Sequence, residues 1–233
     1  MQTEGRGNGS AEAAGGPATA AGSGASSDAE RSIADIIAVA TAEFAEKGLA
    51  GARIDVIAER TRTSKRMIYY YFKSKEGLYL AVLEEAYRGM RGIEATLDLE
   101  HLPPRQALRA LVGFTFDYQR ANPDFIRLVM NENMHKGEFL KKSPNIRALN
   151  APAIDALRDI YRRGLEEGVF REGLDPIDLH ISISALAFFN VSNQYTFSLI
   201  FDRDVTAEDR VAARRKNVED MVLGYMLKQN SFS

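Results

Sequence analysis

Basic and phenolic side chains gather between residues 53 and 75, and these are the types that bind nucleic-acid phosphates. Seven cations stand there against two anions, although the formal net charge of all 233 residues is only −2. Arginine and lysine neutralise phosphates, and tyrosine hydroxyls hydrogen-bond to phosphate oxygens. On charge alone, a solvated helix face is an equal alternative. Tyr69, Tyr70 and Tyr71 favour DNA, because they point about 100° apart on a helix and cannot all enter one core.

Two short helical patterns would position these side chains. Ile54, Ile57 and Ala58 recur at helical spacing in the first pattern. A polar break then ends at Ser64, whose hydroxyl can cap a second helix over residues 65–71. Ile68 and Phe72 would face inward from this second helix, and its first residues would reach base edges in a major groove. The pattern therefore predicts a helix-turn-helix for duplex DNA.

The run from residue 33 to residue 83 resembles the DNA-binding region of the tetracycline-repressor (TetR) family of bacterial transcription regulators. Its most specific part is IYYYFKSKEGL at residues 68–78, which is similar to the closing signature of that region along its whole length. The resemblance implies that Tyr69 and Tyr71 hold the DNA backbone and that Lys75 binds a further phosphate. It also implies that Lys65 and Arg66 lie where the family reads bases.

Two residues depart from the family pattern. Arg62 stands where the family usually has a turn glycine, and Ala52 stands where a threonine usually opens the second helix. We therefore expect a strained or reshaped turn and a second helix capped by backbone or water. Arg53, at the head of that helix, becomes a candidate phosphate ligand. The residues predicted to contact DNA are Arg53, Ser64, Lys65, Arg66, Met67, Tyr69, Tyr71 and Lys75.

Composition bounds the rest of the chain. It has no cysteine, which excludes disulfides and thiolate metal sites, and no apolar run approaches the ~18–20 residues of a membrane span. We therefore expect a soluble, cytoplasmic protein. Residues 1–30 are rich in glycine, alanine and serine, which predicts a disordered arm. The expected division is this arm, a helix-turn-helix domain over 31–78, a ligand-binding and dimerisation domain over 79–229, and a tail over 230–233.

Everything after residue 75 has helical periodicity, so the sequence predicts an all-α fold of about nine helices. The expected later helices cover residues 75–97, 105–121, 124–134, 145–168, 177–201 and 207–229. The segment 177–201 is apolar nearly all round, and 207–229 carries a narrower apolar stripe. We expect these two helices to form a homodimer, as the family resemblance implies. The alternative is a monomer in which they close its own core.

Aromatic and polar residues alternate across the middle helices, as in small-molecule pockets. The resemblance to the family also implies a ligand. The candidate ligand-binding residues are Phe114, Tyr118, Phe125, Met130, Asn133, His135, Tyr161, Phe189, Asn190 and Asn193. The alternative for each aromatic is ordinary core, and the asparagines could instead pair across a dimer interface.

Metal binding and catalysis find little support. Glu132 and His135 are three residues apart and could share a cation with His180, but no further ligand accompanies them. A solvated Glu132 and hydrogen-bonded imidazoles are the favoured interpretation, with no metal and no cofactor. No nucleophile stands beside a base in a recognisable pattern, so the protein is not expected to be an enzyme.

The sequence therefore predicts a repressor that a small molecule releases from operator DNA. Two alternatives remain open. One is a ligand-free DNA-binding adaptor whose larger domain docks another protein. The other is a helical enzyme with an incidental basic face.

Overall fold

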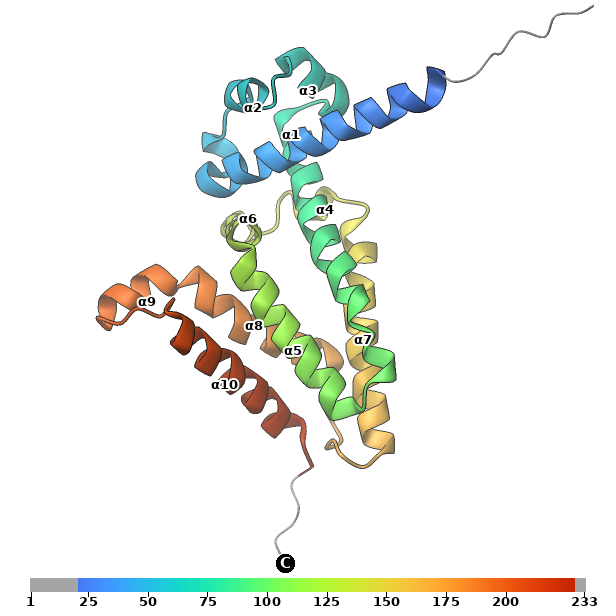
Figure 1. Ribbon diagram of the computed structural model, residues 1–233, viewed down its shortest axis with the longest axis vertical. Helices are drawn as coiled ribbons and strands as arrows, with labels where there is room; N and C mark the ends of the chain where they lie inside the picture. The colour runs from blue at the N-terminus through green and yellow to red at the C-terminus, as the bar shows by residue number, and fades with distance from the viewer. Residues whose placement is uncertain (1–20, 229–233) are drawn as a thin grey trace, which may run out of the picture.

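The all-α prediction is confirmed. The structure, a computed structural model, describes residues 21–228, and within them it contains ten α-helices and no β-strand (Figure 1). One isolated antiparallel bridge joins Phe170 to Leu227. In this described part of the chain, no helix combines the length and the apolar character needed to cross a lipid bilayer.

Helices α1 (Ala21–Gly51), α2 (Ile54–Arg60) and α3 (Lys65–Phe72) form a small unit, here called the head, at the top of Figure 1. Phe44, Ile57 and Ile68 have no exposed surface and lie at its centre. The same core includes side chains from the first turns of α4 (Lys75–Glu94) and Leu128 from α6 (Pro123–Met134). The head core therefore extends beyond residue 78, where the sequence suggested a domain boundary.

Helix α1 begins earlier than expected. Residues 21–30 were assigned to the disordered arm, whereas the backbone is helical from Ala21 onward. Alanine has the highest helix propensity, and this stretch holds three alanines. An ion pair between Asp28 and Arg31, three residues apart on one helix face, adds to that preference. Residues 1–20, the remainder of the expected arm, and the tail from 230 lie outside the described residues.

The remaining helices form a larger unit, here called the body. Its bounds agree with the predicted helices to within about three residues at most ends. Two 3-10 turns, η1 (Ala95–Leu97) and η2 (Leu99–His101), follow α4 and lead into α5 (Pro104–Ala121) and α6. A third, η3 (Leu140–Lys142), precedes α7 (Ile146–Glu166). The last three helices are α8 (Pro176–Ser192), α9 (Gln194–Ile200) and α10 (Glu208–Met226).

The predicted single helix over 177–201 is wrong, because the chain breaks it into α8 and α9 at Asn193. The backbone of Asn193 leaves helical geometry, with φ −113° and ψ 5°. Its side-chain amide donates to Ser192 Oγ at 2.7 Å. Asparagine has a low helix propensity and is common at helix ends. Neither glycine nor proline marks the break, so the apolar pattern concealed it.

Helices α5, α7, α8 and α10 enclose the main core of the body. Helix α10 contributes an inner stripe in which Val218, Val222 and Met226 are buried. Its outer side exposes Met221 and Tyr225, and Ile177 and Ile181 of α8 are exposed as well. Helix α10 therefore has apolar side chains on both sides, and among the described residues only the inner stripe is buried.

Candidate nucleic-acid interface

The turn between α2 and α3 has the geometry of a helix-turn-helix. Ser64 Oγ accepts a hydrogen bond from the amide of Met67 at 3.2 Å, which confirms Ser64 as the cap of α3. Arg62 adopts φ 53°, in the left-handed region. The residue at the family's usual glycine position therefore keeps the glycine-like backbone, at the energetic cost of a Cβ there.

The start of α2 is held by a carboxylate from α1. Ala52 is buried, and the N-cap residue Arg53 uses no side-chain cap. Instead the amide of Arg53 donates to Glu43 Oε1 at 3.1 Å. Burial alone would raise the pKa of Glu43, but hydrogen bonds from Lys47 and from this amide keep that pKa below its ordinary value. The expected capping by backbone or water is replaced by a buried, charged acceptor.

The outer face of α3 presents the predicted side chains to solvent. Lys65, Arg66 and Met67 are exposed on its first turn. Tyr69 follows with 43% of its surface exposed and Tyr70 with 66%. Tyr71 is partly buried, because its ring packs against the head core. Two of the three phenols thus point outward, as their angular spacing requires, and Ile68 faces inward beneath them.

An acidic side chain restrains two of these cations. Asp55 Oδ1 lies 2.6 Å from Lys65 Nζ, and its other oxygen lies 3.6 Å from an Arg53 guanidinium nitrogen. The hydrogen bond from Lys65 holds the pKa of Asp55 below its ordinary value. Asp55 is therefore ionised at neutral pH and pairs with the Lys65 ammonium on this face.

The start of α4 lies beside the end of α3. Ser74 Oγ accepts from the amide of Gly77 at 3.0 Å and so caps α4. The ammonium of Lys75 donates to the carbonyl of Ala50 at 3.3 Å, at the end of α1. A Cβ at Gly77 would lie 2.0 Å from the carbonyl oxygen of Phe72, so only glycine fits this close approach between α3 and α4.

The head meets the body through α6. Glu132 is buried at 1% exposure, so the prediction of a solvated side chain is wrong. Its Oε2 accepts from the amides of Phe139 and Leu140 at 3.2 and 3.0 Å. The segment after α6 therefore folds back over Glu132, which helical periodicity alone did not indicate. Tyr79 of α4 is buried alongside, and burial together with the Glu132 carboxylate raises the pKa of Tyr79.

The ten predicted ligand-binding residues do not converge on one cavity. Phe114, Tyr118 and Phe125 form an aromatic chain between α5 and α6, with ring centroids 5.6 and 6.1 Å apart. Phe189 and Asn190 line a groove beside α10. The other residues lie elsewhere: Met130, Asn133 and His135 are exposed at the end of α6, Asn193 ends α8, and Tyr161 is buried.

Two of these residues have evident structural contacts. The hydroxyl of Tyr161 donates to the carbonyl of Arg171 and accepts from the amide of Leu174, each at 3.0 Å. It thus fixes the turn before α8. His135 Nδ1 lies 2.7 Å from the carbonyl of Asn131, one turn back on α6. His180 is half-buried on α8, away from this helix end.

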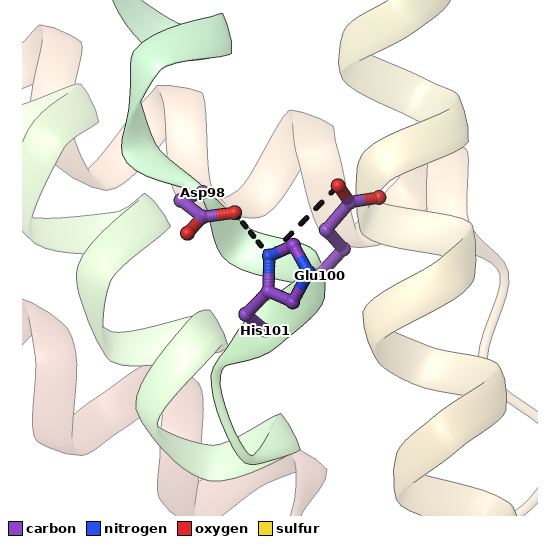
Figure 2. Close-up of side chains that lie close together, drawn as sticks. All are labelled: Asp98, Glu100 and His101. Atoms are coloured by element: carbon purple, nitrogen blue, oxygen red, sulfur yellow. Dashed lines mark hydrogen bonds and ion pairs between the residues drawn. The ribbon is translucent and has the colours of Figure 1, made fainter.

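A different set of potential ligand atoms lies at the end of α4. Asp98, Glu100 and His101 bring their carboxylates and imidazole within 4.8 Å of one another (Figure 2). His101 Nδ1 lies 2.5 Å from Asp98 Oδ1, and this hydrogen bond raises the pKa of His101. All three side chains are exposed and come from one turn. We interpret them as a surface ion-pair cluster and assign them no metal.

Sequence reasoning missed three arginines, Arg203, Arg210 and Arg214, that line the groove beside α10. Their signal was present as a four-residue spacing between Arg210 and Arg214, nine residues after the preceding aromatic residue, Phe201. That spacing places both guanidinium groups on one helix face. It did not show that α9 folds back to form the opposite wall.

Family models match both units of the chain. Residues 36–82 match the family described as bacterial regulatory proteins, tetR family. Residues 104–222 match the family described as tetracyclin repressor-like, C-terminal domain. The first match covers most of the head and the start of α4, and the second covers α5 to most of α10.

Two characterised relatives are similar over most of their length. The transcriptional repressor NicS of Pseudomonas putida is 36% identical over 195 residues, which is 84% of this chain and 92% of that protein. The transcriptional repressor SCO4008 of Streptomyces coelicolor is 32% identical over 164 residues, covering 70% and 80% of the two chains. The chain belongs to the TetR family of bacterial transcription regulators, and it is a DNA-binding transcriptional repressor, not an enzyme.

Solved structures agree with this assignment. The transcriptional regulator SCO4942 from Streptomyces coelicolor aligns with a TM-score of 0.63 at 32% identity, covering 83% of this chain and 97% of that one. A tetR-family regulatory protein from Rhodococcus RHA1 aligns with a TM-score of 0.68 over 86% of this chain and 99% of that one. At 18% identity, the second comparison supports the fold alone.

Proposed function

We propose that the head reads an operator through the exposed face of α3 and binds phosphates on either side of it. The observation that carries this proposal is the first turn of α3, which Ser64 caps. This turn exposes Lys65, Arg66 and Met67 to solvent. Tyr69, and Arg53 and Lys75 at the starts of α2 and α4, would bind the backbone. Tyr71 would contribute only its exposed part. Residues near base edges set specificity, whereas phosphate ligands set the salt dependence.

Selection of bound duplexes from random DNA, at two salt concentrations, tests the proposal. We expect a palindromic motif. Arg66→Ala should change the selected bases, and Lys75→Ala should keep the motif while reducing the slope of log affinity against log salt by about 1. Lys216→Ala, on α10 in the body and paired with Asp220, is the matched control and should change neither. Selection of no motif, or an unchanged motif with Arg66→Ala, would contradict base reading by α3.

We propose a homodimer through α8 and α10, within the predicted segments 177–201 and 207–229. Ile177 and Ile181 of α8 and Met221 and Tyr225 of α10 are each exposed by 44% or more. A second copy packed on this face would remove their apolar surface from water. Two recognition helices held ~34 Å apart would then read successive major grooves.

We propose further that a small molecule bound in the body weakens operator binding by moving α4 and α6. The support is the way these helices enter the head. Leu128 of α6 lies in the head core, and Asn131 Nδ2 donates to the carbonyl of Phe44 at 3.4 Å. A shift of α6 would therefore be transmitted to α1 through contacts already formed.

The division into a head and a ligand-binding body belongs to the same proposal, as does action in the cytoplasm, where the operator would be. The alternative of a protein-docking adaptor predicts a body without cavities. The grooves beside α5, α8 and α10 favour the small-molecule version instead. A ligand that binds tightly and leaves operator affinity unchanged would contradict release by an effector.

A further inference from the structure

A groove of about 910 Å³ lies between the end of α8, the short helix α9 and the first half of α10. Phe189, Phe197 and Phe201 form its apolar wall. The rings of Phe189 and Phe197 meet edge to face, with centroids 4.8 Å apart, and Phe201 follows at 5.1 Å. Such a wall offers ring faces and edges to a flat aromatic ligand.

The opposite wall is cationic. Arg203, Arg210 and Arg214 line it, and Asp209 is the one acid that lines the groove with them. Arg214 Nε donates to Asn190 Oδ1 at 3.0 Å, so a neutral amide fixes this guanidinium without neutralising it. The groove therefore combines an aromatic side with an excess of positive charge, which favours an anion that carries an apolar body.

Arg210 has unused hydrogen-bonding capacity. Its Nη1 is buried and has no hydrogen-bond partner among the described residues. Asp204, which interacts electrostatically with Arg210, accepts instead from the amide and the hydroxyl of Thr206, at 2.8 and 2.7 Å. A guanidinium keeps all its N–H donors because it does not deprotonate, and a buried donor without an acceptor is unfavourable. An incoming carboxylate would satisfy this donor.

We propose that this groove binds an aromatic carboxylate. The ring would lie against Phe189, Phe197 and Phe201, and the carboxylate would accept from Arg210, with Arg214 as a second cation. A neutral analogue would leave Arg210 Nη1 unpaired, and a cationic analogue would be repelled. The binding site follows from this geometry alone, whereas a role for the ligand as effector rests on the proposed function.

The position of the groove would connect such a ligand to the head through packed helices. Asn190, Val205 and Arg214 line both this groove and a second one of about 620 Å³. The second groove extends to Pro123 and Arg127 in the first turns of α6. Because α6 packs against α1, a ligand held by the arginines would lie one helix away from the head.

Three probes that share a naphthalene ring and carry an anionic, a neutral or a cationic polar group test the site on the full-length protein. They are 2-naphthoate, 2-naphthylmethanol and 2-naphthylmethylammonium, and their fluorescence is easy to follow because the chain has no tryptophan. We expect naphthoate to bind at least tenfold more tightly than the alcohol and the ammonium to bind least. Equal affinities for the three probes would overturn the proposal.

Two variants locate the binding. Arg210→Met should weaken naphthoate binding at least tenfold and leave the alcohol unaffected. Arg158→Met, an exposed arginine on α7 paired with Asp155, is the matched control and should change neither. Unchanged naphthoate binding in Arg210→Met would overturn the proposal. The proposal would also be overturned if Arg210→Met altered only the sedimentation of the protein, because the groove would then be filled by a second copy.

A competition with operator DNA separates the two proposals. Naphthoate that binds through Arg210 and releases the operator supports both. Naphthoate that binds through Arg210 without affecting the operator supports the site and contradicts the effector part of the proposed function. Failure to bind any operator would contradict the proposed function, and the titration of Arg210→Met would still decide the site.

Discussion

At the scale of single residues, Arg62 keeps the left-handed backbone conformation that the turn requires, although its Cβ makes that conformation unfavourable. Its φ of 53° is unfavourable for any residue with a Cβ. We expect Arg62→Gly to raise the free energy of unfolding by roughly 0.5–1 kcal/mol, the difference between this strain and the chain entropy of glycine. Urea denaturation measures it. Arg60→Gly removes the same charge from the helical end of α2 and should destabilise the protein. Equal effects of the two variants would contradict the strain argument.

Asp55 limits the positive potential of the surface that we propose to bind DNA. Asp55→Asn should free Lys65 and Arg53 and tighten binding to any duplex by roughly fivefold at low salt, because one anion leaves the neighbourhood of the phosphates. The gain should shrink as salt is added. Fluorescence anisotropy with a labelled duplex measures it. Asp155→Asn, which makes the same charge change on α7, should leave DNA affinity unaltered.

His180 makes stability depend on pH. Burial and the nearby Arg91 lower the pKa of His180, so the folded state disfavours its protonated form. Above pH ~6.5 the imidazole is neutral in both states, and below it the unfolded chain takes up the proton first. Stability should therefore fall as the pH falls below 6.5, by up to about 1.4 kcal/mol for each unit of pKa difference.

Denaturation midpoints between pH 5 and 8 should accordingly be less pH-dependent in His180→Gln than in the unaltered protein. His101 provides the opposite control. Its pKa is raised by Asp98, so it stabilises the fold below pH ~6.5 and loses that contribution as the pH rises. His101→Gln should lower stability at acidic pH only. Identical pH profiles in the two variants would contradict this assignment.

At the scale of elements, the junction between α3 and α4 depends on Gly77. Gly77→Ala would place a methyl group 2.0 Å from the carbonyl oxygen of Phe72. We expect a loss of about 3 kcal/mol in stability, because the backbone must move apart, and a large loss of operator affinity. Gly92→Ala, further along the same helix in open space, should be neutral or stabilise by up to about 1 kcal/mol. Calorimetry and an operator-binding assay distinguish the two.

Helical periodicity predicted nearly all of these elements, and it was wrong at a helix break that carries neither glycine nor proline and where a later segment folds over a helix. Asn193 ends α8 at a residue of low helix propensity, which an apolar pattern does not register. Glu132 is buried by a segment that follows its own helix, so no window of sequence contained the cause. The exposed face of α3 was predictable because its residues are adjacent along the chain. The grooves of the body were not, since their walls come from helices distant in sequence.

At the scale of the whole molecule, the proposed dimer predicts a sharp effect from one charge on α8. Ile181→Glu should give monomers in sedimentation experiments and lower operator affinity at least a hundredfold, because each half of a palindrome would be bound separately. Ile93→Glu places the same charge at a similarly exposed isoleucine on α4 and should leave the dimer intact. A dimer that survives Ile181→Glu would contradict assembly through α8 and α10.

Helix α4 belongs to two cores at once. Leu78, Val82 and Leu83 complete the head core, and Met90, two turns further on, packs with Phe125 of α6. Consider a hybrid regulator in which this head is joined at residue 78 to the body of another TetR-family protein. Its head core would contain side chains from both proteins. A graft made beyond Leu83, with Leu128 carried across on α6, would keep that core whole. Hybrids should therefore exchange operator specificity only when the junction leaves the packing of α4 intact. Transfer of the complete DNA-binding motif alone should not be enough.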